Sequence, residues 1–451
     1  MFLSRTRSRS QPPKSPNLTL FQANPIGRMR CLLRFLINRG SIIAQQVLAT
    51  RQFVVAQIQG EPLNRFCGTL LFPWRLTAAK PTSIEQARRI LVLKPDEIGD
   101  VILATGFLRS LRRQCPNARI TIGVKTQCAE LVRNPVFGDR VLLWDSRWRG
   151  EKLSGRRWLH LVFSAFFRWR LGKPDWVLIP RSGLDHVNAI WYAWWSGAYW
   201  ICAHESLLGE CDRTPRHLPN SIVRNLGPAH EVWFHAQMLE HLGLDASDVE
   251  PRVEISAQHE AEAAVFAEEI GLGGEIIALG IGAGEASRRW PIEYFKDLVD
   301  AVTIRRPKSR FVLVGGENDR ELAHELTRDR RRLAVDATGL LSLGATASLL
   351  RDCLLFIGND SGPLHLAAAS GCPTIEISKH PQGGNPWSYS SPVRFGTRAT
   401  RRCVLQPRPV GPECAGECSK PYAHCITRVT VGDVIHALDE ILSPSPCLNP
   451  Q

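Results

Sequence analysis

Residues 90–124 read ILVLKPDEIGDVILATGFLRSLRRQCPNARITIGV and contain a complete strand–helix–strand unit. Residues 90–94 and 119–124 are mostly apolar, as parallel strands that are buried on both faces are. Between them, residues 101–115 place apolar side chains at helical spacing. Because parallel strands need a crossover connection, this stretch predicts an α/β fold with a parallel sheet.

The alternation of strands and helices continues on both sides of a polar stretch near residue 250, where we place a linker. Further strands are expected at 141–144, 176–179, 276–280, 310–314, 354–357 and 374–377, and helices near 291–305, 318–328, 345–352, 363–370 and 431–442. A chain of 451 residues exceeds what one core usually supports. The sequence therefore predicts two Rossmann-like domains, at 83–250 and 251–443, followed by a tail at 444–451.

An N-terminal extension, residues 1–82, holds most of the positive charge. Residues 1–89 contain 14 lysines and arginines against two acids, which leaves +1 of the total +13 for the rest of the chain. This asymmetry argues against nucleic acid as a partner. Residues 1–27 have a disordered composition, whereas 28–58 have a basic amphipathic helical pattern. That helix either packs on the body or lies on an anionic membrane.

The chain shows no apolar run of the length, about 18 residues, that a spanning helix needs, and no secretory signal pattern. We therefore expect a cytoplasmic protein, with contact to the inner face of the membrane left open. Nine of the 13 tryptophans lie between residues 144 and 200, around an aromatic and basic block at 156–170. Such side chains suit a lipid headgroup boundary; the alternative is that they pack inside the first domain.

Thirteen cysteines, most of them single within apolar stretches, indicate reduced and buried thiols. A group near the C-terminus is different, because Cys403, Cys414, Cys418 and Cys425 lie close in sequence with His424 beside the last. These side chains are either packing thiols or ligands of a structural metal.

The loop at 94–100, Lys-Pro-Asp-Glu-Ile-Gly-Asp, follows the first strand and opens the first helix. Gly99 permits a tight turn there. Asp100, at the start of the helix, is either an N-cap or a carboxylate at the mouth of a cleft that can accept a proton from a hydroxyl.

Two loops of the second domain have the residue types of a phosphate site. Residues 280–284, Gly-Ile-Gly-Ala-Gly, are followed by Arg288 and Arg289. Residues 358–365, Gly-Asn-Asp-Ser-Gly-Pro-Leu-His, lead from a strand into a helix whose free N–H groups can face an anion. The alternatives are a plain turn for the first loop and helix capping by Asp360 or Ser361 for the second.

These three loops together resemble glycosyltransferase family 9, the heptosyltransferases of lipopolysaccharide core assembly. The matching stretches are Asp-x-Ile-Gly-Asp at 96–100, a basic residue before Trp-Pro at 290–291, Gly-Asn-Asp-Ser-Gly-Pro-x-His-Leu-Ala-Ala-Ala at 358–369, Val-Gly-Gly at 314–316 and Ala-Thr-Gly at 337–339. The resemblance runs from about residue 90 to 440. It implies the GT-B fold, in which an acceptor-binding domain and a nucleotide-sugar-binding domain face each other across a cleft.

The resemblance also implies a reaction. An inverting, metal-independent transferase would move a heptose or related sugar from an ADP-sugar to a lipopolysaccharide core or related lipid-anchored glycan, with no cofactor. Asp100 matches the general base, and Arg288 matches a cation that assists the departing diphosphate. The other implied positions are Gly282, Ala283, Gly284, Arg289, Glu317, Asp319, Thr338, Gly339, Asp360, Ser361, Gly362 and His365 for the donor, and Gly99 and Arg181 on the acceptor side.

Other functions stay open at this point. The chain could be a non-catalytic glycan-binding relative, or a transferase that uses another nucleotide sugar. A nucleotide-sugar epimerase or dehydrogenase is less favoured, since it needs Gly-x-Gly-x-x-Gly after the first strand and residues 94–100 lack it.

Overall fold

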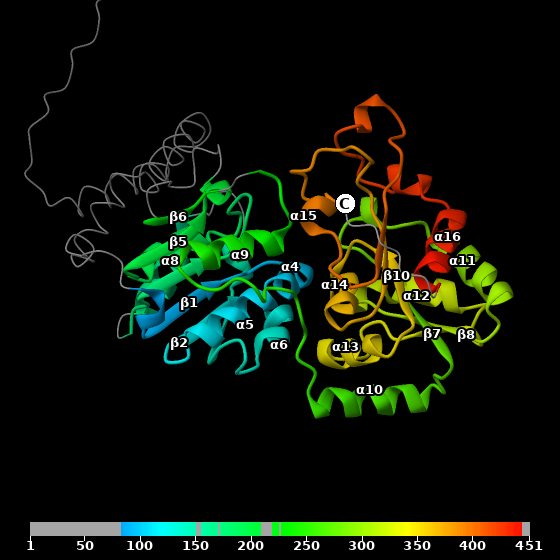
Figure 1. Cartoon of the computed structure of the whole chain (residues 1–451), viewed down its shortest axis with the longest axis horizontal. Helices are drawn as coiled ribbons and strands as arrows, with labels where there is room; N and C mark the ends of the chain where they lie inside the picture. The colour runs from blue at the N-terminus through cyan, green and yellow to red at the C-terminus, as the bar shows by residue number, and fades with distance from the viewer. Residues whose placement is uncertain (1–82, 150–154, 170–171, 209–218, 225–226, 444–451) are drawn as a thin grey trace, which may run out of the picture. The chain divides into compact units, whose positions relative to one another are not determined.

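The computed structural model describes residues 83–149, 155–169, 172–208, 219–224 and 227–443 (Figure 1). The chain divides into two units, Met1–Leu71 and Phe72–Gln451, and every described residue belongs to the second. The expected basic tail, the amphipathic stretch at 28–58 and the C-terminal tail lie outside the described residues.

Two six-stranded sheets, each entirely parallel, form the framework of the second unit. The first contains β1 (Arg89–Leu93), β2 (Arg119–Val124), β3 (Arg140–Leu143), β4 (Trp176–Ile179), β5 (Trp200–His204) and β6 (Ser221–Val223), in the order β3-β2-β1-β4-β5-β6. The second contains β7 (Glu275–Gly280), β8 (Ser309–Leu313), β9 (Ala334–Asp336), β10 (Leu355–Asn359), β11 (Thr374–Ile377) and β12 (Arg402–Leu405), in the order β12-β11-β10-β7-β8-β9. The two sheets share one topology, which confirms the doubly wound α/β prediction.

Helices cover both faces of each sheet (Figure 1). Those around the first sheet are α4 (Ile98–Leu103), α5 (Thr105–Gln114), α6 (Ala129–Val132), α7 (Gly155–Trp169), α8 (Ala189–Trp195) and α9 (Glu231–His241). Those around the second are α10 (Ala257–Glu269), α11 (Ile292–Arg305), α12 (Arg320–Thr327), α13 (Leu343–Arg351), α14 (Gly362–Ala369), α15 (Pro392–Phe395) and α16 (Val431–Leu442). One apolar core continues from the first sheet to one face of the second, and another lies on the second sheet's other face.

The strand order creates one switch point in each sheet, where neighbouring strands lead to helices on opposite sides. In the first sheet it lies between β1 and β4, and in the second between β7 and β10. Loops at the carboxyl ends of such strands diverge and leave a crevice, which is the usual ligand position in open α/β sheets. The fold therefore selects four loops, those after β1, β4, β7 and β10, as the place to look for a site.

The helix expected at 101–115 differs from the structure in two ways. It begins at Ile98, and Ala104 divides it into α4 and α5. Asp100 thus lies within the first turn, while Glu97 occupies the N-cap position without a side-chain hydrogen bond. The interpretation of Asp100 as an N-cap is therefore wrong.

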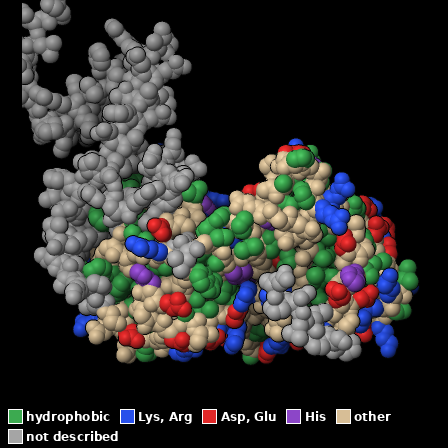
Figure 2. Space-filling model, turned by 45° about the horizontal axis from the view of Figure 1, so that its top comes forward, with side chains coloured by type: hydrophobic (Ala, Val, Ile, Leu, Met, Phe, Trp, Pro, Cys, Tyr) green, Lys and Arg blue, Asp and Glu red, His purple; other side chains and the backbone are tan. Residues whose placement is uncertain are grey.

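The tryptophans between 144 and 200 pack inside the first domain. Five of the nine are buried and the other four are half-buried. Trp144 contacts Trp148 and Tyr192 of α8, with ring centroids 4.9 and 5.0 Å apart. The described helices include none that is long and apolar enough to span a bilayer. On the face shown in Figure 2, acidic and basic side chains are interspersed, and the charge outside residues 1–89 sums to only +1.

Candidate functional site

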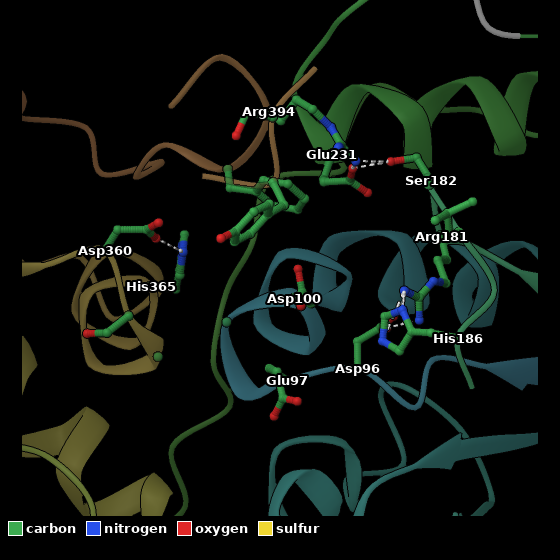
Figure 3. A pocket seen from close by; sticks show the side chains of 18 of the residues that line it. Asp96, Glu97, Asp100, Arg181, Ser182, His186, Glu231, Asp360, His365 and Arg394 are labelled. Carbon is green, nitrogen blue, oxygen red and sulfur yellow. Dashed lines mark hydrogen bonds and ion pairs between the residues drawn. The ribbon is translucent and has the colours of Figure 1, made fainter. Parts of the chain in front are cut away.

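A cavity of about 740 Å³ lies where the two switch points meet (Figure 3). All four selected loops contribute to its lining, together with the start of α9 and the segment 385–395. The structure brings eight of the predicted site residues to this cavity: Gly99, Asp100, Arg181, Arg288, Asp360, Ser361, Gly362 and His365.

Asp100 projects from the first turn of α4 into the cavity and is half-buried. Burial raises the pKa of Asp100 above its usual range; Lys94 opposes this rise, and Asp96 and Glu231 add to it. A carboxylate with a raised pKa is a stronger base while ionised, which suits proton removal from a hydroxyl.

The first turns of α4 and α14 touch at the cavity floor. A side chain at Gly99 would place its Cβ only 2.6 Å from Cδ2 of His365, so only glycine fits there. A Cβ at Gly362 would lie 3.2 Å from Cγ2 of Ile98. Two sequence motifs more than 250 residues apart thus meet directly, and this contact sets the width of the cavity at its base.

The N-terminus of α14 is open toward the cavity. Its N-cap residue, Ser361, makes no capping hydrogen bond; the hydroxyl donates to the carbonyl oxygen of Asn359 at 3.1 Å. Asp360 does not cap the helix either, because its carboxylate contacts Arg288 at 3.3 Å and His365 at 3.8 Å. The capping interpretation is therefore wrong for both residues. An uncapped helix start presents backbone N–H groups and a partial positive charge to an anion.

Asp360 is buried and ionised. Burial alone would raise its pKa, but the contact with His365 and the charge of Arg288 outweigh this and hold the pKa of Asp360 below its usual range. Arg288 also contacts Glu285 at 3.9 Å and lies 5.1 Å from the ring centre of Tyr389. Its guanidinium is therefore fixed at the edge of the cavity, next to the start of α14.

Asn359 joins the loops after β7 and β10. Its side-chain amide is fully buried, donates to the carbonyl oxygen of Ile281 at 2.9 Å and accepts from the backbone N–H of Trp290 at 2.9 Å. This explains why an asparagine precedes Asp360, and it holds the Arg288 loop in register with α14.

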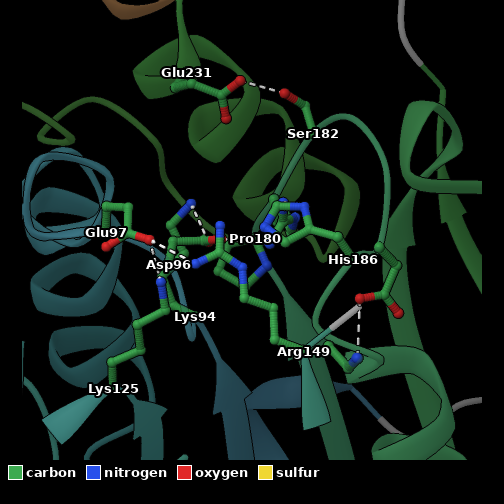
Figure 4. Close-up of polar contacts among 12 residues, drawn as sticks. Lys94, Asp96, Glu97, Lys125, Arg149, Pro180, Ser182, His186 and Glu231 are labelled. Carbon is green, nitrogen blue, oxygen red and sulfur yellow. Dashed lines mark hydrogen bonds and ion pairs between the residues drawn. The ribbon is translucent and has the colours of Figure 1, made fainter. Parts of the chain in front are cut away.

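A buried charge cluster forms the wall on the side of the first sheet (Figure 4). Asp96 contacts Lys94 at 3.0 Å and accepts a short hydrogen bond from Arg181. Burial alone would raise the pKa of Asp96, but Arg181 and Lys94 hold it well below its usual range. Arg181 also contacts His186 at 2.9 Å, and burial together with that guanidinium lowers the pKa of His186 to about 4. His186 is consequently neutral at pH 7.

Glu97, at the rim of this wall, interacts with a second pair of cations, Lys125 and Arg149. It forms an ion pair with Lys125, accepts from Gln127 at 3.0 Å and lies 3.6 Å from Arg149 (Figure 4). The whole cavity is lined by six Lys/Arg and seven Asp/Glu side chains, so net charge does not favour an anion. The features that favour an anion are instead the open start of α14 and the position of Arg288.

A buried ion pair crosses the cavity between the two sheets. Arg394 of α15 contacts Glu231, the first residue of α9, at 2.6 Å and donates to Ser182 at 2.5 Å. Burial alone would raise the pKa of Glu231, but Arg394 and Lys94 outweigh it and lower that pKa to about 2. His230 adds a hydrogen bond of 2.8 Å to the carbonyl of Gly396.

The remaining predicted donor residues gather beside the cavity without lining it. They come from the loops after β7, β8 and β9: Gly282, Ala283, Gly284, Arg289, Glu317, Asp319, Thr338 and Gly339. Asp319 accepts from the N–H of Gly316 at 3.0 Å and presses against Gly282, where a side chain would overlap its carboxylate. Arg289 donates to the carbonyl of Ala283 at 3.0 Å. Their role in donor binding stays a prediction.

Sequence reasoning missed several cavity residues. Lys94, Asp96 and Glu97 lie in the quoted motif, and their position after β1 was a signal for them. Glu231, Tyr389 and Arg394 gave no signal, because they reach the cavity only through tertiary folding. Lys379 was also missed; it is buried behind the rim and contacts Glu285 and Ser287 at 3.2 Å and the Tyr389 hydroxyl at 3.0 Å.

Known proteins resemble this chain in sequence and fold. A family model described as glycosyltransferase family 9 (heptosyltransferase) matches residues 215–398. Lipooligosaccharide heptosyltransferase 2 of Haemophilus influenzae is 23% identical over 308 residues, which cover 64% of this chain and 82% of that protein. A family 9 glycosyltransferase of Veillonella parvula has a similar crystal structure, with a TM-score of 0.62, 23% identity and coverage of 81% of this chain and 99% of that one. For the ADP-heptose lipopolysaccharide heptosyltransferase II of Escherichia coli the TM-score is 0.56, with 19% identity and coverage of 78% and 98%.

Proposed function

We propose that the chain is a member of glycosyltransferase family 9, whose model matches residues 215–398, and that it transfers a heptose or closely related sugar from an ADP-sugar to a lipopolysaccharide core or related lipid-anchored glycan. One observation supports this most directly. A half-buried carboxylate from the first sheet, Asp100, shares one cavity with the uncapped start of α14 and with Arg288 from the second sheet.

The donor diphosphate binds at the start of α14 in this proposal. Its oxygens accept hydrogen bonds from the backbone N–H groups there, as anions do at helix N-termini. Arg288, positioned by Asp360 and Glu285, lies beside them. The nucleoside extends toward the loops after β8 and β9, where Glu317, Asp319 and Gly339 gather.

The proposed reaction is a single displacement with inversion. The acceptor hydroxyl oxygen attacks the anomeric carbon opposite the diphosphate, and its proton passes to Asp100. The bond between the anomeric carbon and the diphosphate oxygen breaks, and ADP leaves with the electron pair. Negative charge builds on the diphosphate in this step, and fixed N–H groups and a guanidinium stabilise such charge without a metal.

The charge cluster around Asp96 and Arg181 serves the acceptor in this proposal. Arg181 is already engaged by Asp96 and His186, so its role is to shape the wall, while Lys125 and Arg149 at the rim are more accessible to an anionic sugar. We further propose that the protein acts in the cytoplasm at the inner face of the membrane, because a lipid-anchored acceptor is held there.

Substitution of Asp100 by Asn tests the proposal. Donor binding, measured by calorimetry with ADP-heptose, should be unchanged, whereas ADP release with acceptor should fall by about 10²–10⁴-fold, the usual contribution of a general base. Wild-type kcat/KM should also fall as the pH drops through the raised pKa of Asp100, because the base must be ionised. That acid limb should be absent in the Asn variant.

Asp352→Asn is the matched control, because that carboxylate is 69% exposed and lies outside the cavity lining. It should keep both binding and turnover. Near-normal turnover of Asp100→Asn would remove Asp100 from the mechanism. A thermal-shift screen with ADP-, GDP- and UDP-sugars separates the alternatives, since a bound donor stabilises the fold. Binding without any transfer would indicate a non-catalytic relative.

A further inference from the structure

Four metal-binding side chains converge in the segment that follows β12. The ligand atoms of Cys414, Cys418, His424 and Cys425 all lie within 4.8 Å of one another. The three cysteines are buried, with 1%, 3% and 0% of their surface exposed, and His424 is half-buried. This group lies outside the lining of the large cavity, apart from its neighbour Glu417.

The three nitrogen–sulfur distances in the group match edges of a tetrahedron around a metal. Nδ1 of His424 lies 3.7, 3.5 and 3.5 Å from the sulfurs of Cys414, Cys418 and Cys425. A tetrahedral zinc ion with bonds of about 2.3 Å to sulfur and about 2.0 Å to nitrogen separates these atoms by about 3.5 Å. One nitrogen equidistant from three sulfurs is not the arrangement that apolar packing of thiols selects.

Neither apolar packing nor a disulfide explains the group. The three cysteines form a buried cluster of their own, separate from the two large cores. The segment from β12 to the 3-10 turn at Cys425–Arg428 contains only one other short turn, Pro412–Cys414. Irregular segments longer than about 12–15 residues are uncommon in compact domains without a specific role or constraint. All three cysteines are free thiols, so no disulfide supplies that constraint.

Cys403, which lies near the other three cysteines in the sequence, does not belong to the group. It lies on β12, is half-buried and is absent from the converging set. His424 supplies the fourth ligand in its place. The sequence grouped Cys403 with the other three because it lies near them in the chain, whereas the structure places it on strand β12, apart from the converging side chains.

We propose that Cys414, Cys418, His424 and Cys425 bind one structural zinc ion. Three thiolates and one imidazole in tetrahedral arrangement are a typical zinc ligand set. Four protein ligands leave no open position for a substrate, so the ion stabilises the segment and takes no part in transfer. This inference does not depend on the sugar or acceptor proposed above.

The zinc ion would fix one wall of the donor side. Glu417, next to Cys418, lines the large cavity. Residues 417–421 also line a second cavity of about 520 Å³ together with Glu285, Lys379 and Tyr389. The N–H of Asn385 donates to the carbonyl of Gly416 at 2.7 Å, which joins the segment to the 385–395 stretch of the cavity. Loss of the ion should therefore increase the mobility of the residues at 417–421 that border the two cavities.

Metal analysis of the full-length protein, purified without chelators, tests the proposal. Elemental mass spectrometry should find one zinc per chain. Cys414→Ser and Cys425→Ser should each lose nearly all of it, whereas Cys403→Ser, the matched control outside the group, should retain it. Replacement by cobalt should give the visible absorption of a tetrahedral thiolate complex, which the control also gives.

A second measurement does not require stable variants. Titration of the wild-type thiols with a mercurial reagent should release zinc in step with the modification of three cysteines, and should lower the melting temperature. Metal-free protein, or a disulfide between two of these cysteines in mass spectrometry, would overturn the proposal. Stoichiometric iron in place of zinc would overturn the assignment of zinc, as would zinc lost equally from the Cys403→Ser control.

Discussion

Arg288 is the cation best placed to act on a leaving diphosphate, because it belongs to the loop after β7 and lies next to the start of α14. Its side chain is 21% exposed and contacts Asp360 and Glu285. An already positioned guanidinium needs no reorganisation when charge develops nearby, and this preorganisation is a main source of transition-state stabilisation.

We expect Arg288→Ala to reduce kcat with the proposed donor by about 10²–10³-fold, the usual loss when one such group is removed. Donor affinity should fall much less, because the interaction strengthens as the diphosphate departs. Steady-state kinetics and calorimetry give the two numbers. Arg288→Lys, which keeps a charge beside Asp360, should recover part of the loss, and Arg305→Ala, at the far end of α11, should change neither number. A loss of affinity alone, with unchanged kcat, would contradict this role.

Site residues that belong to strand–loop–helix units were predictable, and those that depend on tertiary pairing were not. Asp100, Asp360 and His365 lie where a buried strand passes into a helix, and the sequence displays both elements around them. Glu231 and Arg394 look like ordinary surface charges in the sequence. Only the structure shows that each is the partner that allows the other to be buried.

At the scale of elements, α9 and α15 meet across the cavity through Arg394 and Glu231. Their side chains are 8% and 3% exposed. Glu231 remains ionised despite its burial because Arg394 and Lys94 offset the loss of water, and its pKa falls to about 2. A buried carboxylate whose partner is removed is strongly destabilising.

We expect Arg394→Ala to lower the free energy of unfolding by about 3–5 kcal/mol, the usual cost of breaking a buried pair. Because the folded pKa of Glu231 lies below its unfolded value of 4.5, the wild-type pair contributes fully above pH 4.5 and loses its contribution as the pH falls toward about 2. The variant should lack this acid-dependent loss. Urea unfolding at pH 7 and at lower pH measures both effects.

Arg351→Ala is the control for this prediction, since its pair with Glu260 is exposed on both sides. It should change the unfolding free energy by no more than about 1 kcal/mol. Equal and small effects of the two substitutions would show that the Arg394 pair is not a determinant of stability.

The sequence predicted eight of the twelve strands described in the two sheets, but it missed the other four and several helices. The strand Thr374–Ile377 and the helix Val431–Leu442 were predicted with their observed bounds. The missed strands are β5, β6, β9 and β12, and the missed helices include α7, α8, α9 and α10. Edge strands and short strands show no uniform apolar run, and α9 has buried residues on most of its circumference, so neither has a clear period.

At the scale of the whole molecule, the aromatic surface suited to a membrane lies within the block at 156–170 that the sequence indicated, but it is formed by phenylalanine and leucine instead of tryptophan. The tryptophans are inside, whereas α7 exposes Leu159, Phe163 and Phe167, with 48%, 54% and 58% of their surface accessible. The rings of Phe163 and Phe167 are stacked, 5.9 Å apart. The exposed Arg156, Arg157 and Arg168 lie on the same helix. Each basic residue near an anionic surface adds about 1 kcal/mol of attraction.

Full-length protein should co-sediment with vesicles that contain phosphatidylglycerol at low salt, and less so at high salt, because salt screens the attraction. A chain that begins at Ser83, which removes the basic extension, should bind clearly less, and Phe163→Ser with Phe167→Ser should bind less again. Neutral vesicles and the exposed-site substitution Leu340→Ser are the controls. Equal binding by the full-length and shortened chains, or none by either, would eliminate the extension as a membrane anchor.

The apolar core that continues from the first sheet to the second has a consequence for protein engineering. Enzymes made of an acceptor half and a donor half invite recombination, in which one half is replaced by that of a relative with another specificity. Here the halves share a core, and Gly99 against His365 and Ile98 against Gly362 leave no space between them. A chimera would inherit one side of each contact, so the crossover must be chosen together with compensating residues in α4 and α14. Donor and acceptor specificity are therefore better altered by loop substitution than by exchange of whole domains.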